Sequence, residues 1–289
     1  MELSSRFDSP APGGENALTH GWRTVGVRGL VTGAGRIEMV HVLELDPELG
    51  RHVSASALEP ASCAAIAPLL SLAPGAPEFT IDRPAPAGHL GMLMIDGLIA
   101  LRVSFGQIGS AEFIGPGDVL RPWAMSDTVD IFHAQWEALV PTRLAVLDRD
   151  FATRVRPWPE LTAALLDRYT ERLASQLLQS ALRQVRRVDD RVLLALWHFA
   201  ARWGQVGPEG RIVQLPNITG EVLAQVVGAR RQSVSTALSA LTANGAIQRR
   251  PGGGWLVRDK PLQLEHPEGH RRLSDRASRA QHTSPQTRA

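Results

Sequence analysis

The sequence is poor in cysteine and in long apolar runs, and each of these shortages excludes a class of protein. Its one cysteine, Cys63, has no second cysteine with which to form an intramolecular disulfide or to hold zinc or an iron–sulfur cluster, so we expect a small buried residue. No apolar run approaches the roughly 20 residues that span a bilayer, and the N-terminus lacks the basic start and apolar centre of a signal peptide. The sequence therefore predicts a cytoplasmic protein with no membrane partner and no structural metal.

Arginine replaces lysine almost throughout, since only Lys260 among the 31 basic residues is a lysine. The formal net charge is small, at +2, but positive charge is concentrated in one segment. Between residues 211 and 260, seven basic residues stand against two acidic ones, which gives a local net charge of +5. A short basic segment in a nearly neutral chain is typical of a nucleic-acid-binding surface.

The 289 residues are enough for two domains with their own cores. Residues 1–40, rich in glycine, proline and small polar residues, are expected to be a flexible extension, and the polar residues 261–289 a disordered tail. Residues 41–158 contain short apolar runs broken by glycine, proline and aspartate, which favour an antiparallel β-sandwich or jelly roll. Within this region, Asp96-Gly97 lies between two apolar runs and predicts a β-hairpin.

From Pro159 the apolar period becomes helical and predicts one long helix over residues 159–187. Leucines recur at steps of three and four, and adjacent pairs at 165/166 and 177/178 widen the apolar stripe. Two sides of this helix therefore require burial, one against the β domain and the other against a second copy of the chain. A long core helix in a monomer is the alternative interpretation.

The segment GEVLAQVVGARRQSVSTALSAL, residues 220–241, has the spacing of a helix-turn-helix motif. Ala224, Gly228 and Val234 provide a small contact residue, the turn and a core position, because glycine adopts the left-handed conformation of such a turn at low cost. In the second helix Val234, Leu238 and Leu241 are expected to face inward. A surface pair of helices whose charges are merely solvated is the alternative.

A predicted hairpin follows the motif, with its loop at Pro251–Gly254, so residues 188–260 read as a winged helix-turn-helix domain. The second helix is expected to begin near Arg230 and to place its first turns in the major groove. Arginine pairs bidentately with guanine and glutamine with adenine. The candidate base-reading residues are Arg231, Gln232, Ser235 and Thr236, and the candidate contacts to the DNA backbone are Arg230, Ser233, Arg249 and Arg250.

These segments resemble transcription regulators of the Crp/Fnr family, the relatives of the cyclic-AMP receptor protein. The resemblance covers about residues 41–259 and is strongest in ITGEVLAQVVGARRQSVSTAL, while LDPELG, HLGMLMIDG, GPGDVLRPW and ALVPTRLAVLDRDF are similar to members from high-GC bacteria. It implies an α+β fold with an N-terminal β-roll sensor, a long dimerisation helix and a C-terminal winged helix-turn-helix. It also implies a homodimer with double-stranded DNA and RNA polymerase as partners, gated by a small-molecule effector.

The resemblance also identifies departures from the family pattern. The family's three base-contacting positions, typically Arg, Glu and Arg, fall on Arg231, Gln232 and Thr236. Since two of the three differ, we expect a half-site that differs from the best-known operator of the family.

The sensor departs further. Members that bind cyclic nucleotides carry a Gly-Glu pair followed by an arginine and a small residue. The matching candidates for effector binding are Gly117, Asp118 and Arg121, but Arg121 is followed by Pro122-Trp123. The pattern points away from cyclic AMP and leaves the cofactor or effector unknown.

Two other functions stay open. One is a ligand-independent DNA-binding regulator with a degenerate sensor, and the other is a small-molecule-binding protein or enzyme. An enzyme of the common hydrolytic classes would require a nucleophile elbow, a histidine cluster or paired carboxylates, and the sequence offers no such signature. His89 and His133 are isolated in the predicted sandwich, so we assign no catalytic and no metal-ligating residue.

Overall fold

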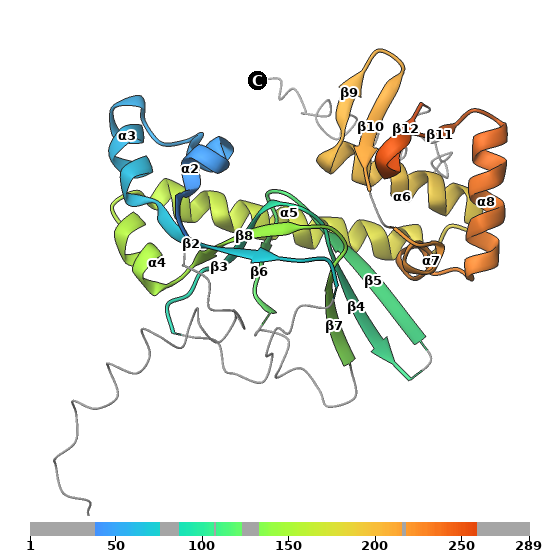
Figure 1. The fold of residues 1–289 in the computed structure, drawn as a ribbon, viewed down its shortest axis with the longest axis horizontal. Coiled ribbons are helices and arrows are strands. Elements are labelled where there is room, and N and C mark those ends of the chain that lie inside the picture. The colour runs from blue at the N-terminus through green and yellow to red at the C-terminus, as the bar shows by residue number, and fades with distance from the viewer. Residues whose placement is uncertain (1–37, 76–86, 107, 123–132, 216–217, 259–289) are drawn as a thin grey trace, which may run out of the picture. The chain divides into compact units, whose positions relative to one another are not determined.

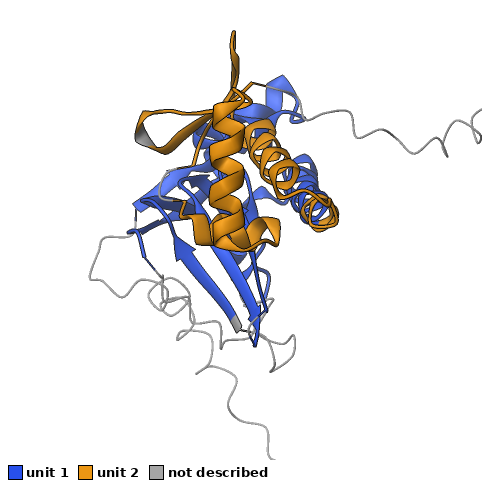
Figure 2. Cartoon of the chain, turned by 90° about the vertical axis from the view of Figure 1, so that its right-hand side faces the viewer, with its two compact units in different colours: residues 1–176 blue, residues 177–289 orange. Residues whose placement is uncertain are grey.

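The structure, a computed structural model, divides into two compact units, residues 1–176 and 177–289 (Figure 2). We call them the N-terminal unit and the C-terminal unit. The residues that the structure describes are 38–75, 87–106, 108–122, 133–215 and 218–258.

Of the predicted flexible extension, residues 1–40, and the predicted disordered tail, residues 261–289, the structure describes only residues 38–40. Glu38–His41 form strand β1, so the prediction of a flexible extension over residues 1–40 is wrong at its C-terminal end. Residues 1–37 and the predicted disordered tail at 261–289 lie outside the described residues.

Two antiparallel sheets form the N-terminal unit (Figure 1), with strand orders β1-β2-β8-β3-β6 and β5-β4-β7. Their strands are β1 (Glu38–His41), β2 (Ile66–Leu72), β3 (Gly91–Asp96), β4 (Ile99–Phe105), β5 (Ile108–Ile114), β6 (Val119–Leu120), β7 (His133–Ala138) and β8 (Thr142–Leu147). Apolar side chains from both sheets, among them Met92, Leu101, Trp136 and Leu144, form one buried cluster. The predicted β-sandwich is therefore confirmed.

Helices pack against the other face of the five-stranded sheet. They are α2 (Val42–Leu45), α3 (Ala55–Ala64), α4 (Arg149–Val155) and the first part of α5 (Pro159–Leu182), with a 3₁₀ turn at Pro47–Gly50. Val42, Phe151 and Leu161 share a buried cluster with Leu93 and Ala145 of the sheet. Strands β3 and β8 are thus buried on both faces, which explains why they read as continuous apolar runs rather than as alternating patterns.

Helices α2 and α3 occupy a stretch that the sequence assigns to the β-roll. α3 contains Pro60, and of its ten described residues Ala61 alone is fully buried. Such a helix has no apolar stripe by which its period could be recognised. Cys63 lies on α3 and is exposed, so the expectation that it is buried is wrong.

The predicted hairpin at Asp96-Gly97 is also wrong. β3 ends at Asp96 and pairs with β6 and β8, whereas β4 begins at Ile99 and pairs with β5 and β7. Gly97 has a φ of 100°, and a Cβ atom there would lie 2.6 Å from the Cα of Thr142. The glycine is needed for the turn and for the close approach to Thr142, but the turn leads the chain from one sheet into the other.

Helices and a small sheet form the C-terminal unit. The helices that follow α5 are α6 (Val188–Trp203), α7 (Gly220–Val227) and α8 (Arg231–Ala243), and the strands are β9 (Gln205–Gly207), β10 (Gly210–Gln214), β11 (Ile247–Arg249) and β12 (Gly254–Val257). The sheet has the order β11-β12-β10-β9. The antiparallel pair β11 and β12 confirms the predicted wing, while the short strands β9 and β10 were not predicted, because glycines interrupt that segment.

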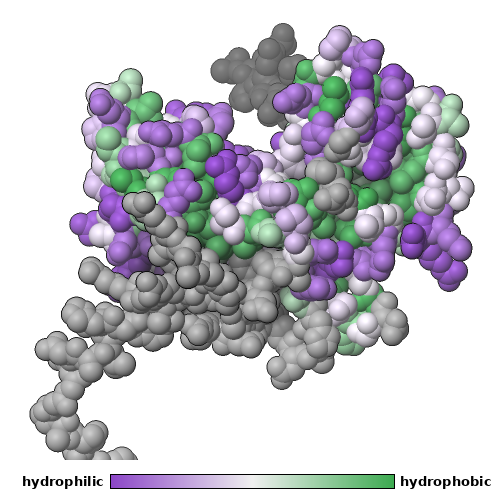
Figure 3. Space-filling view, viewed as in Figure 1, coloured by the Kyte–Doolittle hydropathy of each residue, from purple (hydrophilic) through white to green (hydrophobic). Residues whose placement is uncertain are grey.

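Helix α5 is shorter than predicted and leaves apolar residues on its surface. It ends at Leu182 rather than at residue 187. Leu161 and Leu165 are buried, which accounts for one of the two predicted sides. The leucines on the surface are Leu166, Leu173, Leu177 and Leu178, with exposures of 60%, 61%, 73% and 43%. Figure 3 shows hydrophobic residues, in green, between hydrophilic ones, in purple, on the surface of both units.

Candidate nucleic-acid interface

Helices α7 and α8 and the turn between them form the predicted helix-turn-helix. Thr219 caps α7, since its Oγ1 accepts a hydrogen bond from the Val222 amide at 3.2 Å. Gly228 ends α7 in the left-handed region, at φ 63° and ψ 47°, and the amides of Gly228 and Ala229 both donate to the Ala224 carbonyl. Arg230 is extended and precedes the first turn of α8. Gly228 is therefore the turn residue of the motif, as its sequence position predicts.

Apolar residues hold the two helices together. The buried residues of α7 are Val222, Leu223, Ala224, Val226 and Val227, and those of α8 are Val234, Ala237 and Leu241. The predicted inward positions Val234 and Leu241 are confirmed, but Leu238 is only half-buried and Ala237 takes the fully buried position. The small alanine allows α8 to approach the rest of the unit closely, so the inward face of α8 is fixed.

The opposite face of α8 carries the predicted DNA contacts. Arg230, Arg231, Gln232, Ser233, Ser235 and Thr236 are all exposed. The Thr236 hydroxyl donates to the Gln232 carbonyl at 3.1 Å, a bond that leaves the lone pairs of the hydroxyl oxygen available as acceptors. The structure thus brings the six α8 candidates together on one solvent-facing surface at the start of the helix.

The wing residues have different surroundings. The Arg249 guanidinium lies over the Trp255 ring, 4.6 Å from its centroid, which holds it by a cation–π contact. Arg250 Nη2 donates to Glu209 Oε2 at 3.1 Å, so its charge meets a carboxylate of the β9–β10 turn. Of the two wing arginines, Arg249 is therefore the one whose charge faces solvent without this carboxylate contact.

The three effector-binding candidates lie around a tight turn of the N-terminal unit. Gly117 has a φ of 83°, and Asp118, 3% exposed, accepts a hydrogen bond from the Gly115 amide at 2.9 Å through Oδ2. Arg121 is exposed. The geometry gives Asp118 a part in closing the turn before β6.

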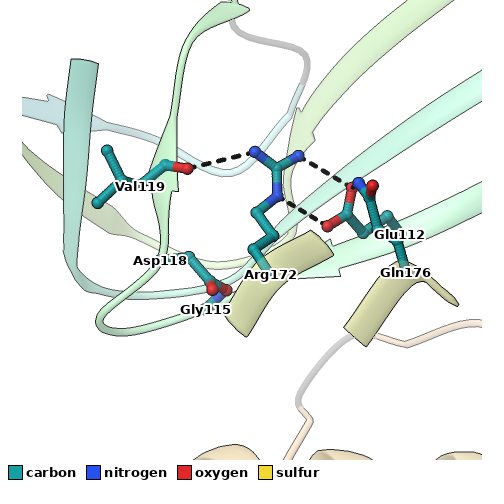
Figure 4. A network of polar contacts seen from close by, with 6 residues as sticks. All are labelled: Glu112, Gly115, Asp118, Val119, Arg172 and Gln176. Atoms are coloured by element: carbon teal, nitrogen blue, oxygen red, sulfur yellow. Dashed lines mark hydrogen bonds and ion pairs between the residues drawn. The ribbon is translucent and has the colours of Figure 1, made fainter. Parts of the chain in front are cut away.

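A polar network that was not predicted lies next to this turn (Figure 4). Arg172 on α5 donates to both carboxylate oxygens of Glu112 on β5, at 2.8 and 2.9 Å, and to the Val119 carbonyl at 3.3 Å. Gln176 donates to Glu112 Oε2 at 2.7 Å. Glu112 and Arg172 are 60 residues apart, so no local pattern could have paired them. The network fastens the first part of α5 to the sandwich.

Neither a membrane-spanning helix nor a metal-binding cluster occurs in the described part of the chain. No helix there is long and apolar enough to cross a membrane. No group of three or more histidine, cysteine, aspartate or glutamate residues there is arranged to hold a metal ion.

Comparison with known proteins gives one family match and a shared fold. Residues 171–264 match the family model described as a Crp-like helix-turn-helix domain. No curated protein sequence matches the chain.

Three solved structures of similar fold share 17 or 18% sequence identity with the chain. A cyclic nucleotide-binding domain containing protein from Listeria monocytogenes EGD-e has a TM-score of 0.55 at 17% identity, over 75% of this chain and 98% of that one. A CooA mutant from Carboxydothermus hydrogenoformans has a TM-score of 0.53 at 18% identity, over 78% and 94%. FixK2 from Bradyrhizobium japonicum has a TM-score of 0.52 at 17% identity, over 67% and 93%. The chain therefore shares the fold of these proteins, with a β-sheet unit at its N-terminus, and it carries a Crp-like helix-turn-helix domain at residues 171–264.

Proposed function

We propose that this protein is a homodimeric, sequence-specific DNA-binding transcription regulator that inserts the start of α8 into the major groove of a two-fold symmetric operator. The observation that carries the proposal is the polar surface of α8 at residues 230–236, which faces solvent while the opposite face is locked into the core. The second helix of a helix-turn-helix is the element that reads base edges in the major groove. Such a protein acts in the cytoplasm, where it meets DNA and RNA polymerase.

Residue roles follow from side-chain chemistry and position. Base reading is assigned to Arg231, Gln232, Ser235 and Thr236, and phosphate contact to Arg230, Ser233, Arg249 and Arg250. Arginine and glutamine make bidentate pairs that are worth about 1–3 kcal/mol of base discrimination each. Contacts to phosphate add affinity without sequence information.

Dimerisation is assigned to the predicted segment 159–187. The exposed leucines of α5 form an apolar surface that a second copy of the helix would cover. We therefore expect Leu173→Arg and Leu177→Arg to convert the dimer into a monomer in sedimentation equilibrium. A wild-type protein that sediments as a monomer at micromolar concentration would remove dimerisation from the proposal.

Effector gating is assigned to residues 41–158, and the DNA-binding step to residues 188–260. The buried cluster between the two sheets of the N-terminal unit is apolar, with Met92, Met94 and Ile99 at 0% exposure. This buried apolar cluster supports, as a second candidate, a regulator that binds DNA without an effector. Operator affinity measured with and without a metabolite extract separates the two candidates, because an effector that is coupled to DNA binding must change that affinity.

A gel-shift series on promoter fragments tests the proposal. We expect a shift with a two-fold symmetric site at moderate salt that unrelated duplex does not compete away. Equal affinity for every sequence, or no shift with any fragment, would overturn it.

A pair of substitutions tests the division of roles. Arg231→Ala should relax specificity at one base position in each half-site, whereas Arg249→Ala should weaken binding to all sequences alike and lower the salt slope by about 1 per half-site. Arg249 is the matched control because it is also an exposed arginine of the C-terminal unit. The same uniform loss for both variants would show that Arg231 reads no base.

A further inference from the structure

Two arginines outside the helix-turn-helix bind the backbone at its turn. Arg183, the residue after the end of α5, donates from Nε to the Val226 carbonyl at 3.1 Å. Arg191, in the first turns of α6, donates from Nη1 to the Gly228 carbonyl at 2.9 Å. Both acceptors lie at the C-terminal end of α7, so the residue after α5 and the start of α6 both contact the motif at its turn.

These carbonyls need partners because a helix end leaves its last carbonyls without donors from the next turn. In α7 the Ala224 carbonyl receives the amides of Gly228 and Ala229, which closes the helix by its own backbone. The Val226 and Gly228 carbonyls lie beyond this closure and receive the two guanidinium groups instead. A cation at this end is also favoured by the helix dipole.

The guanidinium of Arg191 donates to two backbone carbonyls. Its Nε donates to the Val185 carbonyl at 2.5 Å while Nη1 binds Gly228. One planar guanidinium therefore joins the segment that follows α5 to the turn of the motif. A lysine has a single ammonium group and lacks the fork that spans two acceptors in this way.

The side chain of Arg183 fits closely against the turn glycine. A Cβ atom on Gly228 would lie 3.2 Å from Arg183 Cγ and 3.3 Å from its Cδ. Glycine at this position therefore serves the left-handed turn and the packing of Arg183 together.

The turn at Gly228 lies close in sequence to the residues that are proposed to read DNA bases. Ala229 and Arg230 alone separate Gly228 from Arg231, the first residue of α8. A displacement of the Gly228 carbonyl is thus passed directly to the first turn of α8, where the proposed base contacts lie. Base-edge hydrogen bonds tolerate little displacement, because they require donor–acceptor distances of about 2.7–3.2 Å.

We propose that Arg183 and Arg191 are positioning residues, which set the specificity of DNA binding by fixing the turn at Gly228 and hence the entry of α8 into the groove, without touching DNA themselves. This inference rests on the proposed function for its effect on operator binding. Its structural part, that the two arginines hold the turn, stands independently of DNA.

The experiment compares Arg183→Met and Arg191→Met with Arg187→Met in the full-length chain. Arg187 lies in the same segment, has a 73% exposed side chain and pairs with Asp189 rather than with the motif, so the control removes the same charge. Affinities for the operator and for an unrelated duplex are measured at several salt concentrations. We expect operator affinity to fall about 10-fold in each test variant, equivalent to about 1.4 kcal/mol, while affinity for unrelated duplex and the salt slope match those of Arg187→Met.

Two outcomes overturn the proposal. An equal loss on both duplexes together with a lower salt slope would show direct phosphate contact, and operator affinity equal to that of the control would show no positioning role. Arg191→Lys, which keeps the charge, should recover operator affinity only in part.

Hydrogen exchange provides a readout that needs neither DNA nor an operator. The amides of residues 228–232 should exchange faster in the two test variants than in Arg187→Met, while those of β12 are unchanged. If this holds but no variant binds DNA specifically, the proposed function fails and the positioning contact remains. If the amides of residues 228–232 exchange as in the control, the two arginines do not hold the turn and the proposal is wrong. A methionine variant whose β12 amides also lose protection has lost the fold of the unit, and the corresponding lysine variant then takes its place in the comparison.

Discussion

The two units use arginine differently. Beside the exposed pairs Arg51–Glu48 and Arg143–Asp96, the N-terminal unit has three arginine–carboxylate ion pairs with side-chain exposures between 11% and 30%, a buried class that the C-terminal pairs below do not match. These are Arg102–Glu137, Arg168–Asp46 and Arg172–Glu112. In the C-terminal unit the ion pairs Arg187–Asp189, Arg250–Glu209 and Arg258–Glu209 each contain a side chain at least 61% exposed. Its half-buried Arg183 and Arg191 bind backbone carbonyls.

This difference separates charge that holds the fold from charge that can serve a ligand. A buried arginine that loses its carboxylate leaves a charge in a poorly solvated place, which is strongly destabilising. An exposed pair contributes little to stability and can exchange its partner for another anion such as a phosphate. The local net charge therefore supports the proposed DNA surface through the arginines that are exposed, which are Arg230, Arg231, Arg249 and Arg258.

The largest expected effect comes from breaking the buried pair of the N-terminal unit. Glu112→Gln leaves the Arg172 guanidinium, 14% exposed, without its charge partner. We expect a loss of about 3–5 kcal/mol in the free energy of opening of this unit, measured by hydrogen exchange of the β5 amides.

Two controls decide what that loss means. Asp96→Asn breaks the exposed pair with Arg143, whose side chains are 45% and 46% exposed, and should cost less than about 1 kcal/mol. The double variant Glu112→Leu/Arg172→Met replaces both charges by apolar groups and should recover most of the loss. A double variant as unstable as Glu112→Gln would mean that packing, and not the unpaired charge, causes the effect.

The second largest expected effect comes from protonation of His198, which would place a charge in the interior of the C-terminal unit. Burial, with a smaller effect of Arg202, lowers the pKa of His198 on α6 to about 4. The pKa in the unfolded chain is near the usual 6.5, so the folded unit favours the neutral imidazole. The stabilisation is complete above about pH 6.5 and is lost as the pH falls toward 4. We expect a loss of about 2–3 kcal/mol at pH 4.5, read from the exchange of the α6 amides.

His198→Gln isolates this contribution because the amide does not titrate. The difference in free energy between the wild type and this variant should shrink or change sign between pH 7 and pH 4.5. A constant difference across this range would contradict the lowered pKa of His198.

Local signals in the sequence were sufficient for the helix-turn-helix and the wing of the C-terminal unit, but not for β9 and β10. Gly228, the apolar positions around it and the wing glycines specify a turn and a hairpin within about 40 residues. Both the turn and the hairpin appear where the spacing puts them, and of the predicted inward positions of α8 only Leu238 differs. The exposure of Arg231 and Gln232 followed from the helical period of their buried neighbours.

The N-terminal unit depends on contacts that the sequence does not record. Asp96-Gly97 predicts that the chain turns, but which strands pair is decided by the β-sandwich. β3 pairs with β8, whose partner residues lie 47 to 56 positions further along the chain. The Glu112–Arg172 pair joins a strand to a helix in the same non-local way. The sequence alone therefore predicts the class of this unit but not its strand order or its charge network.

A smaller effect tests the backbone of the turn. Gly228→Ala must place a Cβ in the left-handed region, which costs about 1–2 kcal/mol, and that Cβ also crowds Arg183 Cγ at 3.2 Å. Gly245→Ala is the matched control, since its φ is 81° and nothing lies within 4 Å of an added Cβ. We expect a larger loss of thermal stability for Gly228→Ala than for Gly245→Ala, and equal losses would mean that Arg183 yields without cost.

The smallest expected effect on stability comes from Glu209→Gln. This variant is also the sharpest test of the difference between the buried ion pairs of the N-terminal unit and the exposed ion pairs of the C-terminal unit. Glu209 Oε2 lies 3.1 Å from Arg250 Nη2 and 4.0 Å from Arg258 Nη2, and its side chain is 61% exposed. Removing its charge should change the free energy of unfolding by less than about 0.5 kcal/mol, as for other exposed pairs. It should also strengthen binding to every duplex, because the wing arginines then face phosphates without a competing carboxylate, with a steeper salt dependence. Glu171→Gln, which removes an exposed charge from the N-terminal unit, is the control. If Glu209→Gln instead destabilised the unit and left DNA affinity as in this control, the exposed pairs of the C-terminal unit would hold the fold as the buried ones do, and the distinction between the units would fail.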